Sequence, residues 1–221
     1  SIAIMLVYTT RNDDLWLDLE QIPYRGETIL YYTDRQTGEV VEYTRLPSTQ
    51  PTEYVPQERI PQQLKNAFVA IEDQTFYEHN GVSLRRTLYA VVNELKHSIT
   101  GSYIGGDEGR KQGASTIDQQ LIKNLTRDDD DSDMAGYLRK IREIFRAYRL
   151  DADYDKDTII SAYLNVITFT GNTAGVQAEA RKLFGKDVEA LSLAECASLA
   201  AITRNPSRYN PATNPEIHLE R

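Results

Sequence analysis

The sequence predicts a mainly α-helical protein with a small β-hairpin near its N-terminus. Two runs rich in β-branched and aromatic residues, 28–33 and 39–44, flank a turn signal at 34–38 that ends in a glycine. Three prolines between positions 47 and 56 then mark an extended connector. From residue 61 onward, apolar side chains recur at helical spacing almost to the end of the chain.

Glycines, prolines and acidic runs divide the helical part into segments. Pro61 suits the first position of the first helix. Glycines between 105 and 113 predict a loop, and the aspartates at 128–131 with Asp133 predict either a solvated loop or a cation site. We expect further helices at about residues 84–97, 115–125, 137–151, 156–166, then one ending at Phe184, and 193–203.

Composition places the protein among ordinary globular chains. Its 221 residues include 25 Lys and Arg against 33 Asp and Glu, a formal net charge of −8 that argues against a dedicated nucleic-acid binder. The single cysteine, Cys196, excludes an internal disulfide. No run of about 18 apolar residues could span a bilayer. The short apolar run 2–8 predicts a buried strand, an ordinary terminus, or the end of a membrane anchor missing from this chain.

A pair of carboxylates, Glu72 and Asp73, follows the apolar interior of the first predicted helix. A half-buried Glu72 is a candidate general acid or base, because desolvation favours its protonated form. Phe76 and His79 follow at i+4 and i+7, which is the same helical face. The alternative interpretation is an ordinary helix exit with solvated acids and a packed phenylalanine.

A second stretch combines a helix start with a polar face. Ser115 or Thr116 suits the N-cap, and Thr116 with the glutamine three residues later fits a capping box. Gln120, Lys123 and Asn124 share one face of the helix, which could bind sugar hydroxyls and a phosphate. The alternative is a capped amphipathic helix whose polar face meets solvent.

The third stretch, 139–149, is basic within an acidic protein. Five cations and one carboxylate, Glu143, give it a local net charge of +4. Glu143 lies at i+4 from Arg139 and i+3 from Lys140, so surface ion pairs are one interpretation. The other is an anion site with one carboxylate among cations, which suits a phosphate group. The scattered histidines and the one cysteine form no metal-ligand motif.

Together and in this order, these stretches resemble the peptidoglycan glycosyltransferase domain (glycosyltransferase family 51) of class A penicillin-binding proteins and monofunctional transglycosylases. The resemblance covers about residues 58–213 and rests on four motifs and a similar C-terminal tail; the motifs lie at residues 72–81, 113–124, 139–143 and 156–165. The hairpin and connector resemble the segment that precedes this domain in the family. We therefore expect a membrane-proximal segment at 1–57 and a glycosyltransferase domain at 58–221.

The resemblance implies a lysozyme-like, mainly α fold with a membrane-facing lobe, and polymerisation of lipid II into glycan strands. The sugar carbon would be inverted and undecaprenyl pyrophosphate released, with Glu72 as the general base and Glu143 orienting the cations or the diphosphate. The other residues it implies are Lys123, Arg139 and Lys140 at the pyrophosphate, and Ser115, Thr116, Gln120, Asn124, Asp73, Phe76 and His79 in substrate binding. A divalent cation such as Mg²⁺ is expected only at the pyrophosphate.

The implied partners are lipid II, the growing glycan strand, the membrane surface and, in the full-length protein, a transpeptidase domain, but no nucleic acid. The implied location is the outer face of the bacterial cytoplasmic membrane, with an N-terminal transmembrane anchor outside this chain. Four positions depart from the family pattern, which usually has Thr at Asp118, Glu at Ser161, and Arg at Ala135 and Tyr89.

Two other functions compete with the polymerase. A lysozyme-like glycan hydrolase would not need Lys123, Arg139 and Lys140 around a diphosphate, so the basic set argues against it. A scaffold that binds glycan or lipid without catalysis would not need to retain Glu72 and Glu143.

Overall fold

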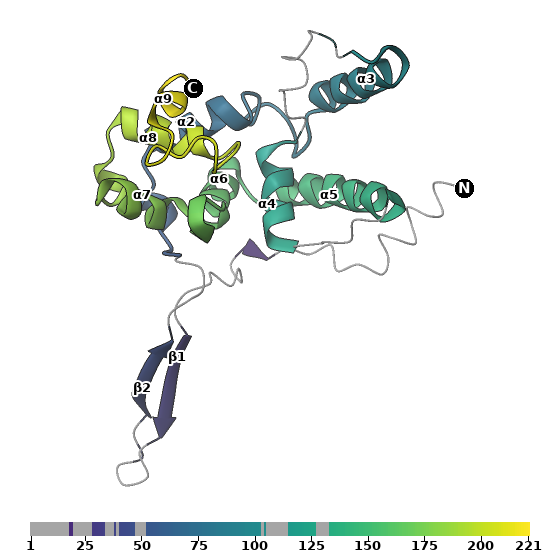
Figure 1. Cartoon of the computed structure of the whole chain (residues 1–221). Coiled ribbons are helices and arrows are strands. Elements are labelled where there is room, and N and C mark those ends of the chain that lie inside the picture. The colour runs from purple at the N-terminus through teal and green to yellow at the C-terminus, as the bar shows by residue number, and fades with distance from the viewer. Residues whose placement is uncertain are drawn as a thin grey trace. The chain divides into compact units, whose positions relative to one another are not determined.

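The structure, a computed structural model, describes residues 18–19, 28–33, 38, 40–46, 52–102, 104, 115–126 and 133–221. It is mainly helical with one two-stranded sheet among these residues, so the predicted fold class is confirmed (Figure 1). The chain forms two compact units, one of residues 1–22 and 62–163 and the other of residues 23–61 and 164–221. The predicted boundary at 57/58 and the membrane-facing lobe stay predictions.

The first unit contains the helices that carry the candidate catalytic residues. They are α2 (Gln62–Glu72), α3 (Leu84–Thr100), α4 (Ile117–Thr126), α5 (Asp133–Asp153) and the first two turns of α6 (Lys156–Val166). Helix α4 packs against α5. The core of the unit consists of fully buried side chains from several helices and from the segment after α2, among them Leu64, Phe68, Phe76, Ile117, Leu121, Ile159 and Tyr163. Their burial is the main source of stability that holds these helices together.

The second unit contains the hairpin and the C-terminal helices. Strands β1 (Thr28–Thr33) and β2 (Val40–Leu46) pair antiparallel, so the predicted hairpin is confirmed. Helices α7 (Val176–Phe184), α8 (Leu193–Ile202) and α9 (Pro215–Leu219) follow. A full capping box begins α8, because Ser192 and Glu195 each bond the other's backbone N–H.

Most of the observed helices begin and end within three residues of the expected bounds, but one begins earlier and one was not expected. Helix α5 begins at Asp133, which the sequence placed in a loop, and aspartate is tolerated at a helix N-terminus because the partial charge there is positive. Helix α9 was not expected, and its short length gives little periodicity to detect. The apolar run 2–8, the glycines at 105–113 and the aspartates at 128–131 lie outside the described residues. Within the described part of the chain, no helix is long and apolar enough to cross a membrane.

Candidate active site

Glu72 is the last residue of α2, and its carboxylate is half-buried. The side-chain amide of Gln120, on α4, donates to Glu72 Oε2 with an Nε2–Oε2 distance of 3.1 Å. The hydroxyl of Tyr163, on α6, donates in turn to Gln120 Oε1 at 3.1 Å. Burial, followed by the negative charge of Glu72, raises the pKa of Tyr163 well above its usual 10. The predicted base thus lies beside two polar groups from other helices.

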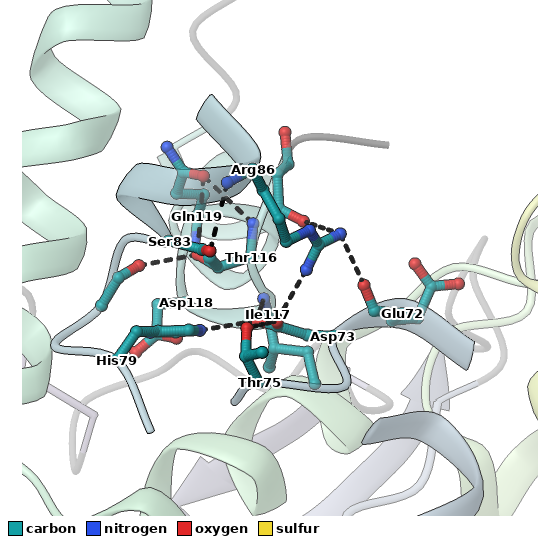
Figure 2. Close-up of polar contacts among 12 residues, drawn as sticks. Glu72, Asp73, Thr75, His79, Ser83, Arg86, Thr116, Ile117, Asp118 and Gln119 are labelled. Carbon is teal, nitrogen blue, oxygen red and sulfur yellow. Dashed lines mark hydrogen bonds and ion pairs between the residues drawn. The ribbon is translucent and has the colours of Figure 1, made fainter. Parts of the chain in front are cut away.

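Asp73 is fully buried directly after α2 and is surrounded by donors (Figure 2). Its carboxylate accepts from Arg86 Nη1 at 2.6 Å and from the Ile117 N–H at 3.1 Å, and His79 Nε2 lies 2.8 Å away. Burial by itself raises the pKa of Asp73, but the His79 contact, the Ile117 N–H and the Arg86 charge together lower it below 3.8. Asp73 therefore connects the end of α2 to the first residue of α4 through a hydrogen bond.

Arg86 joins the first two motifs, although it belongs to none of the motifs recognised in the sequence. Its guanidinium also donates to the backbone carbonyl of Glu72 at 3.0 Å (Figure 2). It donates as well to the backbone carbonyl of Ser115, at 3.4 Å. Arg86 lies three residues before Tyr89 on α3, so the two residues share a helical face. The family usually has an arginine at the position of Tyr89. An arginine one helical turn earlier on the same face was therefore the sequence signal that could have identified Arg86.

The predicted capping box at the start of α4 is confirmed. The Thr116 hydroxyl accepts from the Gln119 N–H at 3.2 Å, and Gln119 Oε1 accepts from the Thr116 N–H at 3.0 Å. Thr116 Oγ1 also donates to the carbonyl of Gly81 at 2.7 Å. Because Thr116 is fully buried, its side chain fixes the second motif against the first.

The second and third motifs meet at Lys140, on α5. Its ammonium donates to Ser115 Oγ at 3.2 Å and lies 2.8 Å from Glu143 Oε2. Arg139 Nε lies 3.9 Å from the other oxygen of Glu143, whose side chain is 9 % exposed. Glu143 is therefore a buried carboxylate between two cations whose own side chains are partly exposed. This arrangement leaves positive charge available to an anionic ligand.

The remaining predicted site residues fall into two groups. Phe76 is fully buried, with its ring edge-on to His79 and Lys156 above it, so it supports the site from the core. Lys123 is exposed on α4, and Asn124 is half-buried beside it.

Asp118 is a buried carboxylate, and neither of its oxygens accepts a hydrogen bond from the described residues. Burial raises its pKa to about 6, although Lys156, whose ammonium lies 3.6 Å from Oδ1, acts in the opposite direction. Lys156 is also ion-paired with Asp151. Asp118 is therefore a buried carboxylate next to Asp73 and His79 of the first motif, at a position where the family usually has threonine.

Three potential metal donors meet here, because ligand atoms of Asp73, His79 and Asp118 lie within 4.8 Å of one another. Two carboxylates and an imidazole can bind a divalent cation. However, the oxygens of Asp73 already accept from Arg86, Ile117 and His79, and Lys156 places a positive charge beside Asp118. The cluster therefore fits an ion-pair network better than a metal site, and the predicted cation at the pyrophosphate stays a prediction.

Comparisons with known proteins agree with the motifs. Residues 37–221 match the family model described as Transglycosylase. The chain is 36 % identical over 214 residues to penicillin-binding protein 1A of Clostridium botulinum (strain Langeland / NCTC 10281 / Type F), covering 93 % of this chain and 24 % of that protein. It is 40 % identical over 172 residues to penicillin-binding protein 1A of Clostridium perfringens (strain 13 / Type A), covering 76 % and 24 %.

A further relative is penicillin-binding protein 1F of Bacillus subtilis (strain 168), which is 38 % identical over 162 residues, covering 73 % of this chain and 21 % of that protein. The chain thus spans about a quarter of the length of the curated relatives it matches. The family model covers most of the chain and the relatives exceed a third in identity, so the predicted resemblance is confirmed. The chain belongs to the transglycosylase family.

Proposed function

We propose that this chain is a peptidoglycan glycosyltransferase that polymerises lipid II into glycan strands and releases undecaprenyl pyrophosphate. The observation that carries the proposal is the constellation of the family motifs around two glutamates in one compact unit. Glu72 is held by an amide donor, and Glu143 lies between Lys140 and Arg139. The first arrangement suits proton abstraction, and the second suits a diphosphate.

Glu72 acts as the general base. Its carboxylate takes the proton from the 4-hydroxyl of the acceptor sugar, whose oxygen then attacks the anomeric carbon of the growing chain. The new C–O bond forms as the bond to the pyrophosphate oxygen breaks, so the carbon is inverted. One base and one good leaving group suffice, whereas a retaining glycosidase needs a second carboxylate as nucleophile.

The basic residues stabilise the leaving pyrophosphate. Negative charge develops on its bridging oxygen, and Lys140, Arg139 and the exposed Lys123 neutralise it. Glu143 keeps Lys140 oriented through their 2.8 Å contact. Ser115, Gln120 and Asn124 contact the donor. Thr116, Asp73 and Phe76, which the resemblance places in substrate binding, are fully buried, so we assign them with His79 to holding the site in shape. A divalent cation at the pyrophosphate would add further charge neutralisation.

Helix α3 supports a membrane surface as a partner. Its exposed apolar side chains recur at i, i+4, i+8 and i+15, which places Leu84, Leu88, Val92 and Ile99 on one face. A lipid-linked substrate must be taken from a bilayer, and an apolar helix face lowers the cost of contact with it. We further propose that the full-length protein is anchored at the outer face of the bacterial cytoplasmic membrane. We also propose that it carries a transpeptidase domain, because its relatives are named penicillin-binding proteins and this chain spans about a quarter of their length.

Incubation with labelled lipid II, with and without the phosphoglycolipid inhibitor moenomycin, tests the proposal. We expect a long polymer that moenomycin abolishes. Cleavage of preformed glycan without polymer would support a lysozyme-like hydrolase instead. Binding of lipid II or glycan without turnover would support an inactive scaffold, and either result overturns the polymerase assignment.

A further inference from the structure

A chain of hydrogen bonds connects the fully buried Tyr163 to the predicted base. Tyr163 donates to Gln120 Oε1 and Gln120 Nε2 donates to Glu72 Oε2, each over 3.1 Å. The three residues come from α6, α4 and α2, which lie in the same compact unit. Tyr163 is therefore linked to the Glu72 carboxylate through one side-chain amide.

The chemistry of the three groups fixes the direction of these bonds. An ionised carboxylate can only accept, so it requires the NH₂ end of Gln120. The amide oxygen then points to Tyr163, and a neutral phenol can donate to it. The phenol keeps its proton, because burial and the charge of Glu72 both raise the pKa of Tyr163. Tyr163 thereby prevents the amide from turning its oxygen toward Glu72, where it would repel the carboxylate.

Packing holds the Tyr163 ring in place. It lies edge-on to the ring of Phe68, with centroids 6.2 Å apart and planes at 77°. Phe68 is fully buried on α2, four residues before Glu72 and on the same helical face. Helix α2 therefore carries both Glu72 and the Phe68 ring that packs against Tyr163.

We propose that Tyr163 is a positioning residue for Glu72 and acts through Gln120, an inference that rests on the proposed polymerase reaction. Tyr163 itself is fully buried and has no exposed surface to offer the substrate. Its hydroxyl affects turnover only by fixing the orientation of the Gln120 amide. Gln120 then has two roles, because its second N–H remains for the donor sugar.

The first test removes only the hydroxyl, with Tyr163→Phe. Steady-state polymerisation of labelled lipid II should show about a fivefold fall in kcat, the effect of one neutral hydrogen bond, with KM unchanged within about twofold. The matched control is Tyr154→Phe, which removes a hydroxyl that contacts the backbone N–H of Leu19 in the same unit. We expect this control to retain wild-type kcat. Wild-type kcat in Tyr163→Phe, measured per folded molecule, overturns the inference.

A double-variant cycle distinguishes action through Gln120 from a general loss of packing. Gln120→Leu should lower kcat, and adding Tyr163→Phe to it should lower kcat no further. Fully additive losses would overturn the inference.

A readout independent of turnover separates this inference from the proposed function. The side-chain amide NMR signals of Gln120, assigned by their loss in Gln120→Leu, should shift in Tyr163→Phe and stay in place in Tyr154→Phe. Unmoved signals in Tyr163→Phe overturn the inference even if the protein makes polymer. A wild-type protein that makes no polymer overturns the proposed function, while shifted signals would still support the orienting contact.

Discussion

The ammonium of Lys140 lies 2.8 Å from Glu143 Oε2, one helical turn further along α5. The same ammonium contacts Ser115 Oγ at 3.2 Å, just before α4 begins. One cation thus connects two segments that lie 25 residues apart in the sequence. The contact with Ser115 joins the second and third motifs, and the Lys140 side chain stays 45 % exposed beside the buried Glu143.

Replacing Lys140 with alanine should reduce turnover of lipid II by about a hundredfold, because the leaving pyrophosphate loses a charged donor. Steady-state polymerisation by purified protein measures the effect. Lys186→Ala is the control, because Lys186 is an exposed lysine that also pairs with a glutamate, Glu195, but both residues lie in the other unit. Equal turnover by Lys140→Ala and wild type would contradict the substrate role of the basic cluster.

Arg86→Gln should lower the free energy of unfolding by about 3 kcal/mol, because it leaves the fully buried Asp73 carboxylate without its guanidinium partner. It should also slow turnover, because Arg86 holds the Glu72 carbonyl. Urea denaturation and polymerisation assays measure the two effects. Arg85→Gln changes the exposed neighbour on the same helix and should alter unfolding by no more than about 0.5 kcal/mol. Similar losses in both variants would refute the special role of Arg86.

Asp118 should make stability depend on pH in a definite direction. Burial raises the pKa of Asp118 from its usual 3.8 to about 6, so folding favours the protonated form. The stability from this group is full below about pH 4 and is lost as the pH rises through 6. Lys156, His79 and Asp151 are the charged or titratable groups that act on it.

Asp118→Asn cannot ionise and should escape this loss. Its free energy of unfolding should exceed that of the wild type more at pH 8 than at pH 4, by on the order of 3 kcal/mol. Urea denaturation at pH 4, 6 and 8 gives the comparison. A difference that does not change with pH would show that Asp118 titrates normally.

Gly81→Ala should destabilise the junction between the first motif and α5. Gly81 has φ +76°, and an added Cβ would lie 2.6 Å from the carbonyl carbon of Ala147 and 2.9 Å from the Tyr148 nitrogen. We expect a loss of about 3 kcal/mol or more, from the backbone strain and the clash together. Gly101 has φ +69°, but an added Cβ there would meet nothing within 4 Å, so Gly101→Ala should lower the free energy of unfolding by only about 1 kcal/mol. Equal losses by thermal or urea unfolding would exclude the clash.

Local features of the site were predictable from the sequence, whereas contacts between helices were not. The capping box of Thr116 and Gln119 spans three residues, so spacing alone indicates it. The Glu72–Gln120 bond joins residues 48 apart, and no periodicity specifies such a pair. Spacing also gave no indication that Asp118 is buried, because an aspartate in the first turn of a helix usually meets solvent.

Glu72→Gln tests the role of Glu72 as the general base most directly. The substitution keeps the size of the side chain but removes the group that accepts the proton, so the melting temperature should stay near that of the wild type. Polymer formation from labelled lipid II should fall at least about a hundredfold. Glu78→Gln, an exposed glutamate in the same segment, should polymerise like the wild type. Near-wild-type polymer formation by Glu72→Gln would contradict the role of Glu72 as the general base.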